Sequence, residues 1–122
     1  MRRIRLFASA ACLVLAAACR RSDQTPLVPG ASISAGKAAI REYSCGACHQ
    51  IPGIPEARGL LGPPLTGIRE RTLIAGEVAN SAANLAAWIH DPQAIEPTTG
   101  MPDLGVDDST ARDIVAYLYT VH

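Results

Sequence analysis

Cys45-Gly46-Ala47-Cys48-His49 is the most informative segment of this 122-residue sequence. Two thiols three residues apart, followed at once by an imidazole, form the Cys-x-x-Cys-His pattern by which c-type haem is attached. The thiols can form thioethers with the two vinyl groups on one side of a porphyrin, and the histidine is then delivered to one face of the iron. We therefore expect one covalently bound haem c per chain, held by Cys45 and Cys48, with His49 as an iron ligand.

Other uses of this motif fit the sequence less well. A thioredoxin-like redox pair requires a βαβ setting, and no convincing alternating β pattern is present. A structural zinc site requires a second pair of ligands, but only His90 and His122 are left, and their spacing is wrong for a zinc finger. A plain disulfide between Cys45 and Cys48 is the simplest alternative.

Met101 is the candidate for a second iron ligand on the opposite face of the haem. It is the only methionine after Met1, and it lies in the loop of residues 98–102, well after His49. A thioether is a soft ligand that favours ferrous iron and raises the reduction potential relative to a second imidazole. The alternatives are a methionine that only fills the core, or ligation by His90 or His122. His90 lies at a solvent-prone helix end, and His122 is the last residue.

The residues around these candidates predict an all-α domain over residues 34–122. Proline and glycine are frequent from Pro52 to Gly67 and leave no room there for a long element. Three helices are expected. The first is capped by Ser34 and runs to the first cysteine, and the second is capped by Asn84, has Leu85, Trp88 and Ile89 on one face and is stopped by Asp91-Pro92. The third begins at Asp107 or Asp108 and has an apolar face formed by Ala111, Ile114, Val115 and Leu118.

The first 18 residues read as an export signal. Arg2, Arg3 and Arg5 precede the apolar run 6–18, which ends in small residues, as secretory signals do. As a helix this run would cover about 20 Å, too short for a hydrocarbon core of about 30 Å. We therefore expect the protein to be exported to the periplasm or to the outer face of the membrane.

Cys19 follows this signal in a context that resembles a bacterial lipobox, although Ala16 stands where leucine is usual. A lipidated Cys19 would be the mature N-terminus and would anchor the protein to a membrane. Ordinary signal peptidase cleavage after Ala18 is the alternative and would leave Cys19 as an unpaired thiol. We favour lipidation, because an orphan thiol is unusual in an oxidising compartment. Residues 19–33 contain two prolines and a glycine, and we expect a flexible linker there.

Composition limits the possible functions further. The whole chain has 11 basic and 11 acidic residues, and removal of Arg2, Arg3 and Arg5 with the signal leaves 8 basic residues. No basic patch suggests nucleic-acid binding. The chain has one Phe, one Trp and three Tyr, so a large apolar cofactor would help to form the core of so small a domain.

Residues 34–122 resemble a class I monohaem cytochrome c, and in particular the cytochrome c domain fused to subunit II of caa3-type cytochrome oxidases. The matching stretches are Cys45 to Ile51, Gly62-Pro63-Pro64-Leu65-Thr66, Arg71-Thr72-Leu73 with Ala75-Gly76, Leu85 with Trp88-Ile89, Asp91-Pro92-Gln93, Met101-Pro102 and Val115-Ala116-Tyr117-Leu118. The oxidase subunit also carries two transmembrane helices and a copper-binding domain. Since these do not fit in 122 residues, we expect the cytochrome module to stand alone.

The resemblance implies a cytochrome c fold of three to five helices around one haem, with His49 and Met101 as axial ligands. It implies that the carbonyl of Pro63 accepts the proton on the far nitrogen of His49, as metal-bound histidines usually require. It also implies that Gly36 and Tyr117 let the first and last helices cross closely.

Trp88 and Arg71 are candidates to hold the haem propionates. The alternatives are a core tryptophan and a solvated arginine. Ala47, Ile51 and Pro52 are expected to rim the exposed thioether edge of the haem.

The expected function is one-electron transfer between respiratory redox proteins, with a terminal oxidase or a cytochrome or quinol dehydrogenase complex as partner. With both axial positions filled we expect a carrier and not an enzyme, and we expect a monomer. The alternative is a haem enzyme or a gas or peroxide sensor in which Met101 dissociates, but the sequence offers no distal acid–base residues for such chemistry.

Overall fold

The computed structural model describes residues 27–122. The predicted signal peptide, the candidate lipidation site Cys19 and most of the predicted linker therefore lie outside the described residues. The helices are α1 (Ile33–Glu42), α2 (Ala82–His90), α3 (Pro92–Ile95) and α4 (Asp108–Leu118), with two 3₁₀ turns, η1 (Cys45–Ala47) and η2 (Ile68–Glu70). Strands β1 (Leu73–Ile74) and β2 (Val78–Ala79) form a small antiparallel hairpin. The fold is mainly helical, as the sequence predicts.

Helix α1 begins earlier than expected. Its N-cap is Ser32, whose hydroxyl accepts a hydrogen bond from the backbone N–H of Ala35 at 3.2 Å. Ser34, the expected cap, lies within the first turn. The backbone N–H of Ser32 also donates to Oδ1 of Asp113 on α4 at 2.7 Å. The hydrogen bond to Asp113 fixes the chain against α4 at Ser32, so the helix begins after this residue.

Part of the predicted linker is packed against the domain. Val28 and Ala31 are both buried in the hydrophobic core, on either side of a turn in which Gly30 has a positive φ of 73°. Proline and glycine in this segment make a turn that returns the chain to α4. The packed domain thus includes residues 28–33.

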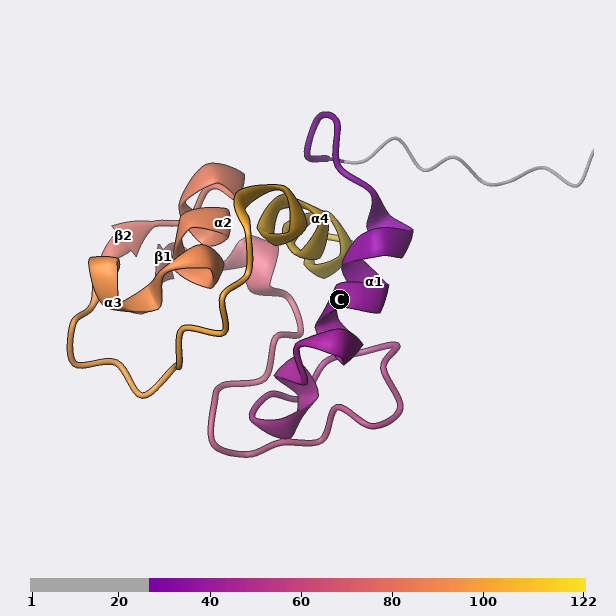
Figure 1. The fold of residues 1–122 in the computed structure, drawn as a ribbon, viewed down its shortest axis with the longest axis horizontal. Coiled ribbons are helices and arrows are strands. Elements are labelled where there is room, and N and C mark those ends of the chain that lie inside the picture. Colours follow the sequence, from indigo (N-terminus) through magenta and orange to yellow (C-terminus); the bar gives the residue numbers. More distant parts are fainter. Residues whose placement is uncertain (1–26) are drawn as a thin grey trace, which may run out of the picture.

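Helices α1 and α4 cross at the centre of the molecule, and α2 packs against α4 (Figure 1). Gly36 makes the crossing possible, because a methyl group there would overlap the carbonyl oxygen of Asp113 and lie 2.9 Å from the backbone nitrogen of Ile114. The Tyr117 hydroxyl donates to the carbonyl of Pro52 at 2.7 Å and so ties α4 to the loop after the cysteine motif. The buried residues of α4 are Ala111, Ile114, Val115, Ala116, Tyr117 and Leu118, which include the whole predicted apolar face.

Helix α2 also begins before its expected cap. Ser81 is the N-cap and accepts from the N–H of Asn84 at 3.1 Å, so Asn84 is already inside the helix. The Asn84 side chain instead donates to the carbonyl of Ala79 at 2.8 Å. The end of α2 is as predicted: Asp91 is its C-cap and then caps α3.

Two long irregular segments lie on one side of these helices. Residues 48–67 follow η1, and residues 96–107 connect α3 to α4; both run below the crossing helices in Figure 1. The first segment carries His49 and Pro63, and the second carries Met101. Within residues 27–122 no helix is both long and apolar enough to cross a membrane.

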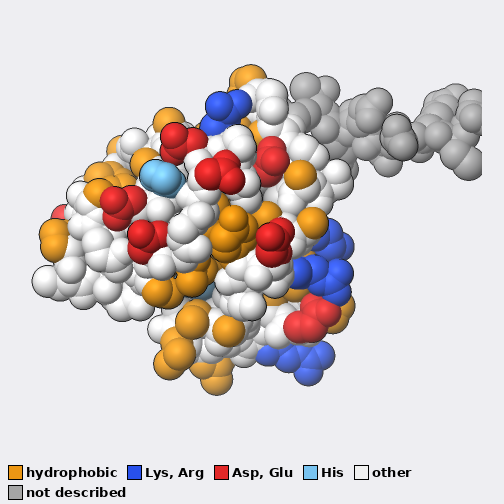
Figure 2. All heavy atoms as spheres, viewed as in Figure 1, with side chains coloured by type: hydrophobic (Ala, Val, Ile, Leu, Met, Phe, Trp, Pro, Cys, Tyr) orange, Lys and Arg blue, Asp and Glu red, His pale blue; other side chains and the backbone are white. Residues whose placement is uncertain are grey.

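Charged and apolar side chains are unevenly distributed on the face shown in Figure 2. Acidic side chains gather over the upper part, where α2 and α4 lie, and hydrophobic side chains gather along the lower edge, where residues 48–67 run. Within the latter segment, Leu60 and Leu61 are 82% and 89% exposed. These two exposed leucines thus lie at the cysteine-motif end of the molecule.

Candidate functional site

The 3₁₀ turn η1 sets the spacing of the two thiols. Ser44 has a left-handed backbone conformation with φ of 55°, which ends α1 and redirects the chain into the motif. The N–H of His49 then donates to the carbonyl of Cys45 at 3.0 Å. Cys45 and Cys48 are both free thiols and half-buried, and burial raises the pKa of the Cys45 thiol. Both sulfur atoms are therefore unpaired and sit at the spacing that haem attachment requires.

The imidazole of His49 is oriented by a backbone carbonyl. Its Nδ1 lies 2.8 Å from the carbonyl oxygen of Pro63, which is the contact implied by the family resemblance. A carbonyl can only accept a hydrogen bond, so Nδ1 carries the proton. In the neutral ring the lone pair of Nε2 is then available to a metal.

Gly62 brings the Pro63 loop close to the His49 ring. A methyl group on Gly62 would overlap Cε1 of His49 and lie 2.6 Å from Nδ1. The N–H of Gly62 donates to the carbonyl of Cys48 at 2.8 Å, which fixes the loop against the motif. The requirement for glycine here comes from space beside the ring, because Gly62 does not have a positive φ.

Arg71 lies behind this loop. Its guanidinium donates to the carbonyl of Pro64, directly after the carbonyl that holds His49. The backbone carbonyl of Arg71 in turn accepts from Nδ2 of Asn80 at 2.9 Å. A chain of hydrogen bonds therefore leads from the imidazole loop to the β1–β2 hairpin.

Asn80 is a further residue of this region, and no sequence motif marks it. Its amide nitrogen donates to the carbonyls of Ile68 and Arg71, at 2.7 and 2.9 Å, and its Oδ1 is buried with no protein partner. An asparagine before a helix reads from sequence as a turn residue, so no local signal indicates this role. Trp88, the other propionate candidate, is half-buried on α2 and packs against the core.

Met101 is held by a different set of contacts. The side-chain amide of Gln93 on α3 donates to the carbonyl of Met101 at 2.7 Å, and the N–H of Met101 donates to Oγ1 of Thr99 at 3.2 Å. Met101 itself is half-buried. Gln93 lies in a stretch that matches the family, but no local pattern predicts this contact, because it joins α3 to a residue eight positions later in an irregular loop.

The two other histidines have partners of their own. Nδ1 of His90 lies 2.6 Å from the carbonyl of Val106, and Nε2 lies 3.9 Å from Oδ1 of Asp108. The Val106 hydrogen bond and nearby carboxylates raise the pKa of His90. His122 is exposed and lies 3.6 Å from Oε1 of Glu70. Both rings are thus engaged at the surface, which favours Met101 as the second ligand.

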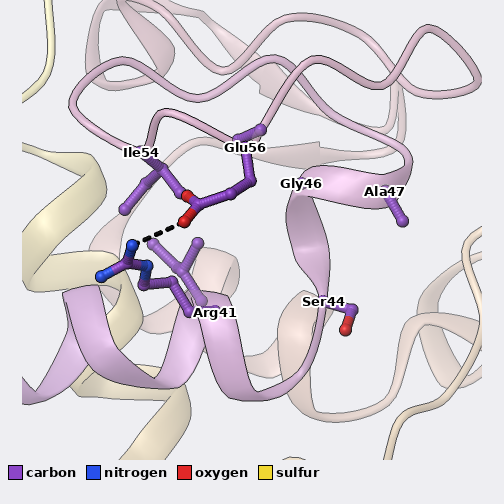
Figure 3. A pocket seen from close by; sticks show the side chains of 8 residues that line it. Arg41, Ser44, Gly46, Ala47, Ile54 and Glu56 are labelled. Atoms are coloured by element: carbon purple, nitrogen blue, oxygen red, sulfur yellow. Dashed lines mark hydrogen bonds and ion pairs between the residues drawn. The ribbon is translucent and has the colours of Figure 1, made fainter.

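A shallow pocket of about 360 Å³ lies beside the motif, between the end of α1 and residues 54–57. Arg41 and Glu56 face each other across it, with Nη2 and Oε1 2.6 Å apart (Figure 3). Gly46 and Ala47 form the wall contributed by η1. This ion pair is exposed at both ends, so it is worth little in stability, but it lies where the loop after the motif returns to α1.

One expectation about the haem edge is wrong. Ile51 is only 3% exposed and belongs to the core, so it does not rim an open surface. Its N–H donates to the carbonyl of Ala57, and the N–H of Ile54 donates to the carbonyl of Ile51, both at 3.3 Å. These bonds fold the loop back on itself and turn Ile51 inward. Ala47 is exposed and Pro52 half-exposed, as the prediction requires.

The residues present fit a covalently bound haem. Two free thiols stand at the attachment spacing, and the imidazole that follows them has its Nδ1 proton engaged and its Nε2 lone pair available. In the described part of the chain, no three His, Cys, Asp or Glu side chains cluster closely enough to hold a metal ion by themselves. A zinc site, the alternative use of the cysteines, therefore has no second set of ligands within residues 27–122.

Comparisons with known proteins identify the family of this chain. The family model for cytochrome c matches residues 33–122. Cytochrome c oxidase subunit 2 of Alkalihalophilus pseudofirmus is 38% identical over 86 residues, which cover 68% of this chain and 24% of that protein. The chain thus spans about a quarter of this relative's length, and no solved structure gives a significant match. Since the motif, the helical fold and the family match coincide, the chain belongs to the cytochrome c family of haem-binding electron-transfer proteins.

Proposed function

We propose that this protein is a one-electron carrier with a single haem c ligated by His49 and Met101. The observation that carries the proposal is the hydrogen bond from Nδ1 of His49 to the Pro63 carbonyl, because it leaves Nε2 as the nitrogen that binds iron. Haem c, when bound, supplies the one-electron couple. Cys45 and Cys48 hold it covalently through their sulfur atoms.

The protein's own part in this function would be to supply His49 and Met101 as the two ligands of the haem iron. Pro63 holds the imidazole of His49 in one orientation, and the loop of Met101 supplies the soft thioether that favours the ferrous state. Filled axial positions exclude small ligands and limit rearrangement on electron transfer. Trp88 and Arg71 are proposed to lie near the propionates, and Arg71 also supports the Pro63 loop through the Pro64 carbonyl.

The proposed setting is the outer face of a membrane. The export signal over residues 1–18 and a lipidated Cys19 would place the packed domain, residues 28–122, there behind a short tether. The matched relative is an oxidase subunit, which supports a respiratory partner such as a terminal oxidase or a dehydrogenase complex. The apolar surface around Leu60 and Leu61 and the scarcity of lysine favour brief contacts that do not depend on a ring of positive charge.

The proposal is tested by comparing the wild-type protein with Met101→Ala, each matured in a host that attaches c-type haem. We expect the oxidised wild-type protein to be low-spin and to show the weak far-red band of thioether-ligated ferric haem. Met101→Ala should lose this band, and its reduced form should bind carbon monoxide readily.

Ala38→Ser, at an exposed position of α1, is the control for substitution as such and should keep the band. If oxidised wild-type protein is high-spin and binds carbon monoxide as readily as Met101→Ala after reduction, the iron is open. The protein would then be an enzyme or a sensor.

A further inference from the structure

Both backbone polar groups of Met101, its N–H and its carbonyl, form hydrogen bonds with side chains. Its carbonyl accepts from Nε2 of Gln93 at 2.7 Å, and its N–H donates to Oγ1 of Thr99 at 3.2 Å. Both contacts are partly buried. Because the two groups flanking the Cα of Met101 are tied, the direction in which its side chain leaves the backbone is restricted.

Gln93 reaches the loop from a well-anchored turn. It lies on α3, whose first residue Pro92 is buried and whose N-cap Asp91 accepts from the N–H of Ala94 at 3.0 Å. The N–H of Asp91 in turn donates to the carbonyl of Ala87 at 3.0 Å, so α3 follows directly on the end of α2. The amide of Gln93 is therefore fixed relative to the helical core.

The other contacts near Met101 differ from this one, because they join near neighbours. Thr98 bonds to the carboxylate of Glu96 through both its N–H and its hydroxyl, at 2.8 and 2.6 Å. The N–H of Gly105 donates to Oδ1 of Asp103 at 2.8 Å. Such turns shape the loop locally. Gln93 ties the loop to a helix at Met101 itself.

We propose that Gln93 is a positioning residue that holds Met101 in place as the second iron ligand, an inference that rests on the proposed function. The side-chain amide of Gln93 donates a hydrogen bond to the Met101 carbonyl. This bond lowers the fraction of molecules in which Met101 has dissociated from the iron. Gln93 acts through Met101 and does not itself touch the cofactor. Loss of one such hydrogen bond shifts an equilibrium by about five-fold.

The test uses imidazole as a probe on the oxidised, haem-loaded, full-length protein. Imidazole can bind ferric iron only when Met101 has left, so its apparent affinity reports the Met101-free population. Gln93→Leu keeps the approximate size of the side chain and removes the donor. We expect it to bind imidazole about five-fold more tightly than wild type, with a weaker far-red band and a lower reduction potential.

Two further variants separate positioning from general damage. Gln93→Lys restores a donor on a side chain long enough to reach the carbonyl, and it should return imidazole affinity toward the wild-type value. Thr98→Val removes the Thr98 hydroxyl bond to Glu96 in the same loop and should leave imidazole affinity unchanged. Met101→Ala gives the upper limit of imidazole affinity.

The outcomes distinguish this inference from the proposed function. A far-red band in wild type that disappears in Met101→Ala, combined with equal imidazole affinity in Gln93→Leu and wild type, would overturn the role of Gln93 alone. Equal increases in Gln93→Leu and Thr98→Val would overturn it too, since the loop would then be weakened at any point. Absence of the band in wild type would overturn both proposals.

Discussion

The orientation of the His49 ring depends on two neighbours in the loop that follows the motif. Pro63 accepts the proton on Nδ1 at 2.8 Å, and Gly62 leaves room for the ring to lie against the loop. The hydrogen bond increases the donor strength of the opposite nitrogen. Pro63 thus supplies the hydrogen bond that orients the ring, and Gly62 supplies the space that the ring needs.

Gly62→Ala should disturb this arrangement. The added methyl group would overlap Cε1 of His49, so the ring or the loop must move and the bond to Pro63 must weaken. We expect a loss of stability of about 1–3 kcal/mol and a more positive reduction potential, because a less basic ligand stabilises ferric iron less. Denaturant unfolding and a redox titration of the haem-loaded variant measure these two effects.

Gly100→Ala is the matched control for this variant. Gly100 also adjoins a proposed ligand, but a methyl group there would meet no protein atom within 4 Å. Equal potentials in Gly62→Ala and wild type would show that the contact between Gly62 and the ring does not control ligand geometry.

Part of the candidate site could be predicted from the sequence because it depends on local spacing. Cys45, Cys48 and His49 form a contiguous motif, and their arrangement on one 3₁₀ turn follows from it. Gln93 and Asn80 could not be found in this way. Each donates from its side chain to backbone carbonyls of another segment, and such bonds depend on the path of irregular loops.

At the scale of elements, the crossing of α1 and α4 positions the cysteine motif. Helix α1 leads directly into η1, and α4 is tied to the loop after the motif by the hydrogen bond from Tyr117 to Pro52 at 2.7 Å. Nζ of Lys37 lies 5.9 Å from the centre of the Tyr117 ring and adds a contact between the two helices. The crossing therefore fixes both ends of the segment that carries the thiols.

Gly36→Ala should separate these helices. On an exposed helical surface this change stabilises by about 1 kcal/mol, but here the methyl group would overlap the backbone carbonyl of Asp113. We expect a net destabilisation of about 1–3 kcal/mol, measured by denaturant unfolding of the haem-loaded protein. A decrease in the free energy of unfolding would show that the clash with Asp113 outweighs the higher helix propensity of alanine, and an increase would show the reverse.

Ala38→Ser, at an exposed position of the same helix, is the control and should change stability by less than about 0.5 kcal/mol. A Gly36→Ala protein as stable as wild type would mean that the helices can move apart without loss, and that their close approach does not determine the fold.

The helix starts show where sequence patterns are ambiguous. Ser32 and Ser34 both suit an N-cap, as do Ser81 and Asn84, and local preference does not rank them. The hydrogen bond from Ser32 to Asp113 selects the first cap, and Asn84 is instead used to bind the carbonyl of Ala79. The apolar face of α4 was predictable because four positions repeat with helical spacing.

At the scale of the whole molecule, the two irregular segments that carry the proposed ligands lie on the same side of the helices (Figure 1). The helices form the support, and the proposed ligands lie on loops anchored to it by Tyr117 on α4 and Gln93 on α3. This division explains how a domain with few aromatic residues can hold two distant side chains in place. The acidic side chains over α2 and α4 lie apart from the hydrophobic side chains along the lower edge (Figure 2).

The most direct test of the central claim, a carrier with both axial positions filled, is a redox titration of the haem-loaded protein with and without carbon monoxide. We predict one reversible one-electron transition with the same midpoint in both conditions, since His49 and Met101 leave no site for the gas. Carbon monoxide binds ferrous iron, so an open position would move the midpoint to more positive values. Such a shift, with a high-spin reduced spectrum in its absence, would contradict the account.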